Sequence, residues 1–273
     1  MDLKGQTIAA VGGGSGIGKA VAAQAVAAGA KVIISSRDEA KLDAAVEDLG
    51  AGTALPVDMT DAASVSTWAN TLPHLDHLVI SASSAVHGPF ADLPATELRG
   101  MFDAKFFGPY AVAKAALSKI QTGGSITFFS GVLSRRPGMN CSGLGAVNGA
   151  VEALSRGLAL ELGPDLRVNC LSPGMVRSEA YAGMEDNARE RMYAETGASL
   201  PVGRVGFVDE AAAAAMFLIT NTYTTGVVLD VDGGHMIRQY AQRLHSMECM
   251  NPLARADGSK ETTAISRKLP ENR

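Results

Sequence analysis

The chain has 273 residues and a formal net charge of −4, and 47% of its residues are hydrophobic against 19% charged. This composition supports a sizeable buried core and excludes a disordered chain. The weak negative net charge gives no indication that the protein binds nucleic acid or an anionic membrane. The start lacks a signal peptide, and no apolar run approaches the roughly 20 residues of a membrane helix, so we expect a cytoplasmic protein with no membrane contact. Cys141, Cys170 and Cys249 are too scattered for a disulfide framework or a metal site.

Short apolar, β-branched segments alternate along the chain with Ala-rich amphipathic segments. This alternation predicts repeated βα units around a parallel sheet. The predicted strands are 7–11, 31–35, 53–57, 76–81, 125–129, 167–171 and 226–231. The predicted helices lie near 17–28, 38–48, 61–71, 95–120, 142–162 and 208–220. The expected fold class is α/β, a three-layer doubly wound parallel sheet of the Rossmann-like kind, in a single domain over residues 1–234.

Two segments stand outside this alternation. Residues 175–206 are polar and longer than a normal connection, which predicts a substrate lid. Residues 235–273 are richer in charge and form a C-terminal extension. That extension is either a loose terminus or an arm that packs on a neighbouring subunit.

A glycine-rich run follows the first predicted strand. Residues 12–18 read Gly-Gly-Gly-Ser-Gly-Ile-Gly and lead into the first predicted helix. Glycines there allow the backbone to approach a pyrophosphate, and the free N–H groups and the helix dipole favour its charge. A plain tight turn is the alternative. Since ligands of doubly wound sheets bind beyond the carboxyl ends of the strands, the loops after residues 11, 35, 57, 81, 129 and 171 are predicted to form the site.

Several spaced motifs make residues 4–234 resemble the short-chain dehydrogenase/reductase family. Gly12, Gly16 and Gly18 match its glycine motif, residues 171–178 resemble its nicotinamide-binding loop, and residues 230–234 resemble its terminal strand and turn. The resemblance implies a nicotinamide dinucleotide cofactor and a small-molecule substrate. The predicted cofactor-binding residues are Gly12, Ser15, Gly16, Ile17, Gly18, Ser36, Arg37, Asp58, Met59, Ser81, Ala82, Ser83, Pro173, Gly174, Val176 and Ser178.

The end of the second predicted strand indicates which cofactor is bound. An acidic side chain there would bond the ribose hydroxyls of NAD, whereas this chain has Ser36 and Arg37. A hydroxyl and a guanidinium suit a 2′-phosphate, so we expect NADP(H). The alternative is that Arg37 only solvates the start of the next helix. Asp58 resembles the family's adenine-contacting Asp, and its alternative is a cap on the helix that begins near Asp61.

The chain departs from the family where the chemistry should be. The family's active site uses a Ser, a proton-donating Tyr, a Lys that lowers the pKa of the Tyr, and an Asn from the preceding helix. Aligning residues 148–154 on the family's helix puts Leu144 at the Tyr position and Asn148 at the Lys position. Neither side chain can do the usual work, because Leu144 does not titrate and Asn148 carries no charge. The Ser position falls on Gly131, with Ser130 one residue early.

The family's Asn position falls on Lys105, so the amide and the ammonium have exchanged helices. We hypothesise that Lys105 projects into the same cavity and serves as a proton donor, because a buried lysine titrates lower. A solvated surface lysine is the alternative. The predicted catalytic residues are Lys105, Ser130 and Asn148.

Other polar side chains near the predicted site leave their roles open. Arg135 and Arg136 either bind an acidic substrate or are surface charges. Ser142 is expected to cap the helix that follows. His87 is a candidate acid or base by its ordinary pKa alone.

Three functions fit these residues. The first is an NADP(H)-dependent oxidoreductase with an atypical active site, which reduces an activated C=N, C=C or carbonyl group. The second is a nonredox isomerase, cyclase or dehydratase that keeps the nucleotide, and the third is a catalytically inactive nucleotide-binding protein. The resemblance also implies a homodimer or homotetramer, formed through the helices near 95–120 and 142–162.

Overall fold

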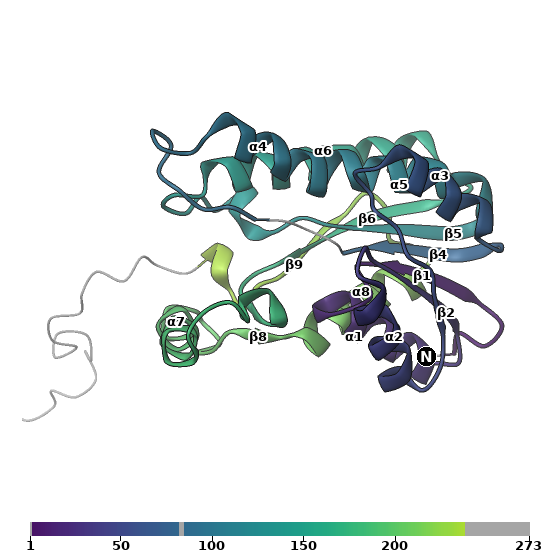
Figure 1. Cartoon of the computed structure of the whole chain (residues 1–273), viewed down its shortest axis with the longest axis horizontal. Coiled ribbons are helices and arrows are strands. Elements are labelled where there is room, and N and C mark those ends of the chain that lie inside the picture. Colours follow the sequence, from purple (N-terminus) through teal and green to yellow (C-terminus); the bar gives the residue numbers. More distant parts are fainter. Residues whose placement is uncertain (1, 82–84, 238–273) are drawn as a thin grey trace, which may run out of the picture. The chain divides into compact units, whose positions relative to one another are not determined.

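The computed structural model describes residues 2–81 and 85–237. Its centre is a seven-stranded parallel sheet in the order β3-β2-β1-β4-β5-β6-β9 (Figure 1). The strands are β1 (Thr7–Val11), β2 (Lys31–Ser35), β3 (Thr53–Ala54), β4 (Leu75–Ile80), β5 (Ile120–Phe129), β6 (Arg167–Pro173) and β9 (Val228–Val231). This arrangement confirms the predicted doubly wound α/β fold. β3 and β9 are shorter than the predicted strands 53–57 and 226–231.

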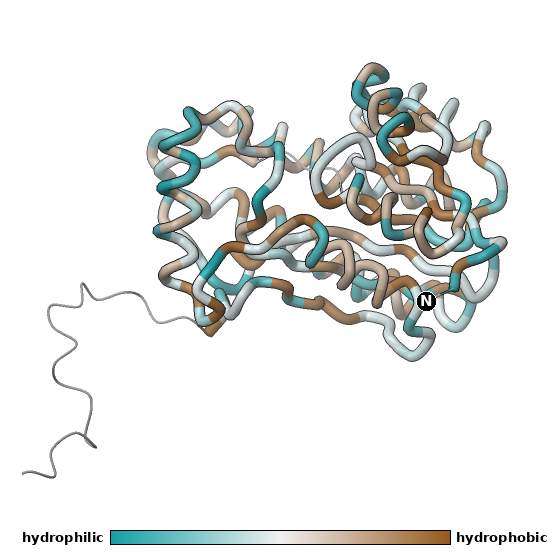
Figure 2. The backbone as a smooth tube through the Cα atoms, turned by 90° about the horizontal axis from the view of Figure 1, so that it is seen from below, coloured by the Kyte–Doolittle hydropathy of each residue, from teal (hydrophilic) through white to brown (hydrophobic). Residues whose placement is uncertain are grey.

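Helices cover both faces of the sheet (Figure 1). One face carries α1 (Gly16–Ala27), α2 (Glu39–Leu49) and α8 (Val208–Thr220). The other carries α3 (Ala62–Thr71), α4 (Ala95–Phe102), α5 (Gly108–Ala116) and α6 (Ser142–Glu161). In Figure 2 hydrophobic segments run through the interior and hydrophilic ones gather on outer turns. The strands read as continuous apolar runs because both of their faces are buried.

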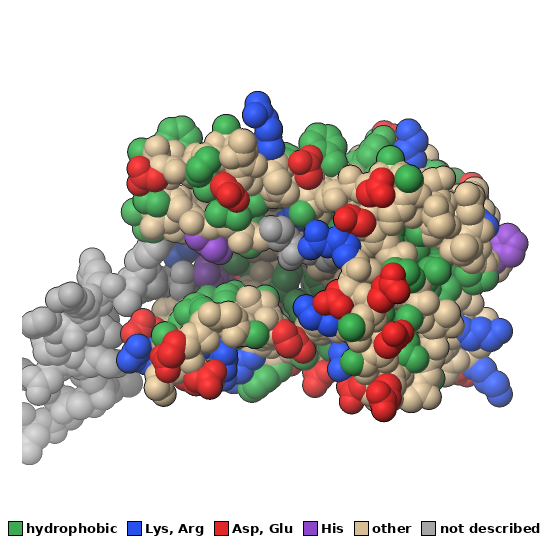
Figure 3. Space-filling model, viewed as in Figure 1, with side chains coloured by type: hydrophobic (Ala, Val, Ile, Leu, Met, Phe, Trp, Pro, Cys, Tyr) green, Lys and Arg blue, Asp and Glu red, His purple; other side chains and the backbone are tan. Residues whose placement is uncertain are grey.

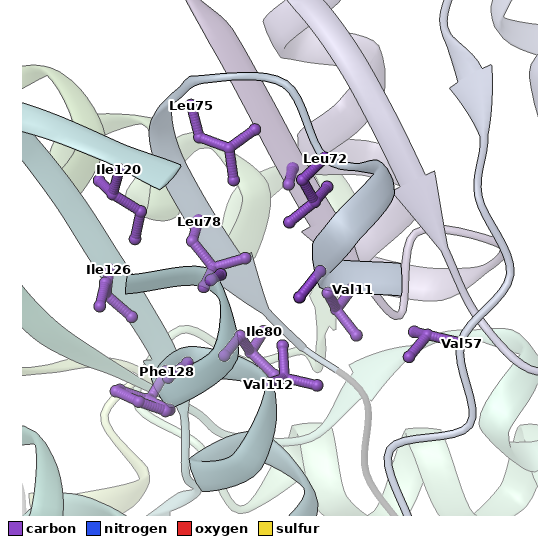
Figure 4. Close-up of a cluster of buried hydrophobic side chains, with 14 of the residues drawn as sticks. Val11, Val57, Leu72, Leu75, Leu78, Ile80, Val112, Ile120, Ile126 and Phe128 are labelled. Carbon is purple, nitrogen blue, oxygen red and sulfur yellow. The ribbon is translucent and has the colours of Figure 1, made fainter. Parts of the chain in front are cut away.

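Each face of the sheet has its own buried apolar cluster, because side chains alternate along a strand. Val11, Leu78 and Ile80 belong to the cluster under α3, α5 and α6, which Figure 4 shows. Ala10 and Val79, one residue away on the same strands, belong to the cluster under α1 and α8. The sheet therefore fixes both helical layers, and with them the loops at its carboxyl edge.

The predicted helix 95–120 is wrong as a single element. A π-helical turn, Asp103–Phe107, separates α4 from α5. Pro109 lacks the N–H that would donate to the carbonyl of Lys105 in a continuous α-helix, and the Gly108 N–H donates five residues back to Asp103. A Cβ on Gly108 would lie 2.8 Å from the Cβ of Met59, so glycine also allows this turn to approach the loop after β3.

Residues 175–206 contain regular structure that the sequence pattern did not predict. β7 (Val176–Arg177) pairs with β8 (Gly206–Phe207), and α7 (Asp186–Ala198) lies between them. In α7 the buried residues are Tyr193 and Gly197, so the helix shows almost no apolar periodicity. Its start is held by the Glu185 carboxylate, which accepts hydrogen bonds from the N–H groups of residues 187 and 188.

Residues 238–273 lie outside the described part of the chain, so the domain boundary at 234 and the C-terminal extension stay predictions. Among the helices of residues 2–81 and 85–237, none is both long and apolar enough to cross a membrane.

Candidate active site and nucleotide cavity

A cavity of about 510 Å³ opens at the carboxyl ends of β1 and β4. These strands are neighbours in the sheet, and the chain winds outward from them in opposite directions, which is where doubly wound folds bind ligands. The space-filling view shows this face hollowed between the layer that carries α4 and α6 and the segment that carries α7 (Figure 3). The predicted cofactor residues that line the cavity are Gly12, Ser15, Gly16, Ile17, Gly18, Ser36, Arg37, Asp58, Met59, Ser81 and Ser178.

The other predicted cofactor residues do not line this cavity. Pro173 ends β6, and Val176 is buried in β7. Gly174 packs against Asp232, whose Cα would lie 2.9 Å from an added Cβ. Pro173, Gly174 and Val176 stay predicted cofactor residues, while Ala82 and Ser83 fall outside the described residues.

The glycine-rich turn is packed too tightly for side chains. A Cβ on Gly13 would lie 2.7 Å from the carbonyl oxygen of Ala10, and one on Gly18 would overlap Gly12 and Ser81. The turn therefore holds the start of α1 close against β1 and β4. Among the described residues, the N-cap Ser15 makes no side-chain hydrogen bond to the helix, so backbone N–H groups of its first turn face the cavity.

Basic and hydroxyl groups line the far end of the cavity. Ser36 and Arg37 follow β2, and Lys41 reaches the same wall from the first turn of α2. Sequence reasoning missed Lys41, although its place in the first turn of the helix that follows Arg37 could have found it. Asp58 accepts hydrogen bonds from the N–H and hydroxyl of Thr60, which lower its pKa with a smaller contribution from Arg37.

The capping alternative for Asp58 is wrong, because α3 is capped by Asp61. The Asp61 carboxylate accepts from the N–H of Ala63 at 3.0 Å. Asp58 instead holds the turn to Thr60 and keeps its carboxylate at the cavity wall.

Lys105 lies in the interior, and this rules out the surface alternative. The residue is 8% exposed and projects from the π-helical turn, next to Ala104, which lines the cavity. Its Nζ donates a hydrogen bond to the Ser130 carbonyl oxygen at 3.0 Å. Burial lowers the pKa of Lys105 to about 8, against a smaller opposing effect of Cys170.

A buried carboxylate, Glu152 of α6, joins Ser130 to a chain of polar groups. Its Oε1 accepts hydrogen bonds from the hydroxyls of Ser130, at 3.1 Å, and Ser134. Its Oε2 lies 3.4 Å from Nε of Arg135, whose two Nη atoms bind both carboxylate oxygens of Asp230. Arg135 is therefore committed to internal partners and is neither a plain surface charge nor free for an acidic substrate.

Sequence reasoning missed Glu152, although its position carried a signal. It occupies a buried stripe on α6 together with residues 144, 147, 148, 151 and 155. A carboxylate among buried positions at helical spacing indicates an internal partner, since an unpaired charge is costly to bury.

Asn148 lies beside Gly131, at the family positions of the Lys and the Ser. It is 2% exposed, and its Oδ1 has no hydrogen-bond partner among the described residues. A Cβ on Gly131 would lie 3.0 Å from Asn148 Nδ2. Leu144, at the family's Tyr position, packs with Met101 and Val147. The structure thus brings Lys105, Ser130 and Asn148 to one end of β5 and supplies no titrating group at Leu144.

Two further expectations concern the start of α6. Cys141 rather than Ser142 precedes the helix, and its side chain makes no capping bond, so the predicted Ser142 cap is wrong. His87 is exposed, with Nδ1 3.3 Å from Cys141 Sγ.

Within residues 2–81 and 85–237, no cluster of three or more His, Cys, Asp or Glu could hold a metal ion.

Comparison with known proteins agrees with this geometry. Residues 11–236 match the family model described as "Enoyl-(Acyl carrier protein) reductase". The chain belongs to the short-chain dehydrogenase/reductase family. Galactitol 2-dehydrogenase (L-tagatose-forming) from Cereibacter sphaeroides, a similar protein, is 35% identical over 86% of this chain and 96% of its own length.

Two solved structures of this family are also similar. A small-chain dehydrogenase in complex with NADPH is 38% identical, with a TM-score of 0.75 over 85% of this chain and 98% of that one. MalC reductase/Diels-Alderase from Malbranchea aurantiaca is 25% identical, with a TM-score of 0.81 over 86% of this chain and 98% of that one. These similarities place the chain among short-chain dehydrogenase/reductase oxidoreductases.

Proposed function

We propose that this chain is an NADP(H)-dependent oxidoreductase in which Lys105 replaces the family's Tyr as proton donor and the substrate is an activated C=N, C=C or carbonyl compound. The observation that carries the proposal is the buried Lys105 ammonium, which follows Ala104 of the cavity wall in the chain and bonds the Ser130 carbonyl oxygen. The cavity suits a dinucleotide because Gly13 and Gly18 hold the turn close against the sheet, and the start of α1 at the cavity wall has no side-chain cap from Ser15 among the described residues.

Different residues of the cavity would contact different parts of the cofactor. The backbone of residues 12–18 would hold the pyrophosphate, and Asp58 would contact the adenosine. Ser36 and Arg37 supply a hydroxyl and a cation that suit a 2′-phosphate better than the ribose hydroxyls of NAD, and Lys41 adds a second cation whose Nζ lies 3.5 Å from the Asp38 carboxylate on the same wall. A bound nicotinamide would supply or accept the hydride.

Lys105 holds the proton in this proposal. With a pKa of about 8 it is mostly protonated at neutral pH, yet it releases a proton far more readily than an exposed lysine. The Ser130 carbonyl orients the ammonium, and the buried Glu152 fixes Ser130 through its hydroxyl. Asn148, whose Oδ1 has no hydrogen-bond partner within residues 2–81 and 85–237, would accept a hydrogen bond from a substrate N–H or O–H group.

The substrate class follows from what surrounds Lys105. Leu144 is apolar at the position where the family has a tyrosine phenol. In this proposal the buried Lys105 ammonium takes the place of that acid. Iminium and conjugated acceptors need less acid assistance than simple ketones, and they suit this arrangement best.

A nonredox activity is the second candidate. One similar structure carries the combined title reductase/Diels-Alderase, so a fold of this kind is associated with ring formation as well as reduction. Product formation without consumption of NADPH would favour it over the first candidate.

The predicted homodimer or homotetramer has support from exposed apolar side chains. Phe107 and Tyr110, at the start of α5, are 55% and 40% exposed, and Leu160 of α6 is 85% exposed. We propose that these two helices form the contact between subunits.

The test of the cofactor assignment is titration with NADPH and NADH, with binding followed by nucleotide fluorescence. We expect NADPH to bind at least about 10-fold more tightly than NADH, and Arg37→Gln to remove most of this preference, since a charged phosphate contact contributes about 1.5–3 kcal/mol. Arg99→Gln, an exposed arginine on α4, is the matched control and should leave both affinities unchanged. Binding of neither nucleotide to the wild-type protein would overturn the proposed function.

A further inference from the structure

A carboxylate from residues 175–206 occupies the predicted pyrophosphate site. Glu179 Oε2 accepts a hydrogen bond from the backbone N–H of Gly16 at 3.0 Å, across 163 residues of sequence. Gly16 is the first residue of α1, and Glu179 lines the same cavity as the glycine turn. An anionic group of the protein itself therefore lies where the first turn of α1 would meet the phosphates.

The helix end explains why a distant carboxylate is stabilised there. The first turn of α1 contains no acidic residue, and among the described residues Ser15 provides no side-chain cap. Its N–H groups and the positive end of the helix dipole are thus left without a local acceptor. Glu179 supplies a negative charge at this helix N-terminus, and a bound phosphate would stabilise the helix end in the same way.

We propose that Glu179 is an internal competitor of the cofactor pyrophosphate, and so a residue that sets nucleotide affinity. This inference rests on the proposed function, because it concerns the same cavity. A dinucleotide can use the Gly16 N–H only after the carboxylate has left it, and a carboxylate that stayed would repel the phosphates. Binding must therefore move Glu179.

The displaced residue belongs to a segment that is joined to α7. The ring of Tyr181 packs edge to face on Tyr193 of α7, with centroids 5.7 Å apart. Arg177 Nη1 lies 2.7 Å from the carboxylate of Glu190, and its guanidinium lies 4.5 Å from the Tyr193 ring centre. Residues 177 and 181 flank Glu179 on both sides, so a displacement that also moves the backbone of residue 179 would strain these contacts with α7.

The experiment compares Glu179→Gln with the wild-type chain in NADPH titrations. The amide keeps the size of the side chain and removes its charge, and we expect NADPH to bind about 2- to 5-fold more tightly, the range for an exposed carboxylate at a helix N-terminus. Glu195→Gln removes the same charge from the exposed surface of α7, outside the cavity, and should leave the affinity unchanged. Adenosine 2′-monophosphate, which lacks the pyrophosphate, should bind equally to all three proteins.

Each result decides the inference. Unchanged NADPH affinity in Glu179→Gln, or equal tightening for adenosine 2′-monophosphate, would overturn it, since the second result indicates a general charge effect. If the wild-type protein binds no NADPH, the proposed function fails, and inorganic pyrophosphate then tests the inference alone. Tighter pyrophosphate binding by Glu179→Gln, together with a shifted Gly16 amide resonance in the unliganded variant, would support it, whereas no change in either would overturn it.

Discussion

The two ends of the candidate active site differ in how their polar groups are held. At the nucleotide end, the backbone of the glycine turn and exposed side chains such as Arg37 face an open cavity. At the reaction end, Lys105, Ser130 and Glu152 are buried and bonded to one another. Binding groups thus stay available to a ligand, while the groups at the reaction end are fixed before any ligand arrives.

This difference predicts where each end is vulnerable. The fold of the nucleotide end depends on backbone shape, so added atoms break it, whereas a change of charge there should alter nucleotide affinity and leave the turn intact. At the reaction end the buried Glu152 carboxylate is matched to Arg135, so removal of its charge should destabilise the protein, whereas the Lys105 ammonium has a carbonyl as its partner and its removal relieves a cost of burial. Three substitutions test the contrast.

Gly18→Ala should have the largest effect. Its Cβ would overlap the Gly12 carbonyl oxygen and Ser81 Oγ, so the turn must move. We expect a loss of about 3 kcal/mol in stability and NADPH binding weaker by about 100-fold or more, measured by urea unfolding and fluorescence titration. Gly100→Ala on α4 meets open space and should be neutral or slightly stabilising. Wild-type binding by Gly18→Ala would refute the tight-turn explanation.

Glu152→Gln should destabilise the protein by about 2–3 kcal/mol. The new amide would direct N–H groups at Arg135 or at the hydroxyls of Ser130 and Ser134, where the carboxylate now accepts. The loss is smaller than for a fully isolated ion pair because Arg135 keeps Asp230. Glu161→Gln, at the exposed end of α6, is the control for urea unfolding. Equal stability of the two variants would show that the buried carboxylate does not hold this end together.

Lys105→Met should increase stability at pH 7 by about 2 kcal/mol. The folded pKa of about 8 lies below the ordinary value of 10.5, so between these pH values the unfolded chain binds more protons and stability rises with pH. The lowered pKa of Lys105 corresponds to about 3 kcal/mol of lost stability at pH 7, which the substitution restores. The hydrogen bond to Ser130 that the variant loses offsets about 1 kcal/mol of this gain. The gain should fade as pH rises from 8 to 10.5.

The readouts for Lys105→Met are urea unfolding against pH and turnover with imines or enones. Turnover should fall about 100-fold or more while NADPH affinity holds, as expected when a general acid is removed. Lys114→Met, an exposed lysine of α5, should show neither the pH-dependent gain nor the loss of turnover. A stability difference that stays constant from pH 7 to 10.5 would contradict the assignment.

The sequence predicted the sheet because its strands are apolar on both faces, and β1 and β2 have the predicted bounds. It did not predict the break at Lys105, although Pro109 was a visible cause, because apolar periodicity continues across it. It missed α7, since a helix that buries little has no periodic signal.

Most of the predicted cofactor residues line the cavity because they belong to turns at the carboxyl edge of the sheet, and their contact with a nucleotide stays a prediction. The partners at the reaction end were not predictable, because they join distant segments. Arg135 and Asp230 are 95 residues apart, and at the nucleotide end the contact of Glu179 with Gly16, also missed, spans 163 residues. Such pairs are set by how loops meet at one edge of the sheet, which no local pattern encodes.

The indole of Trp68 has a spectroscopic consequence. It is the single tryptophan of the chain, it is 1% exposed, and its Nε1 donates to Ser35 Oγ at 2.9 Å in the core. Ser35 immediately precedes Ser36 of the cavity wall. The fluorescence of Trp68 can therefore be followed without an added label. In the folded protein its emission reports the environment at the end of β2, and on unfolding it reports the loss of the core.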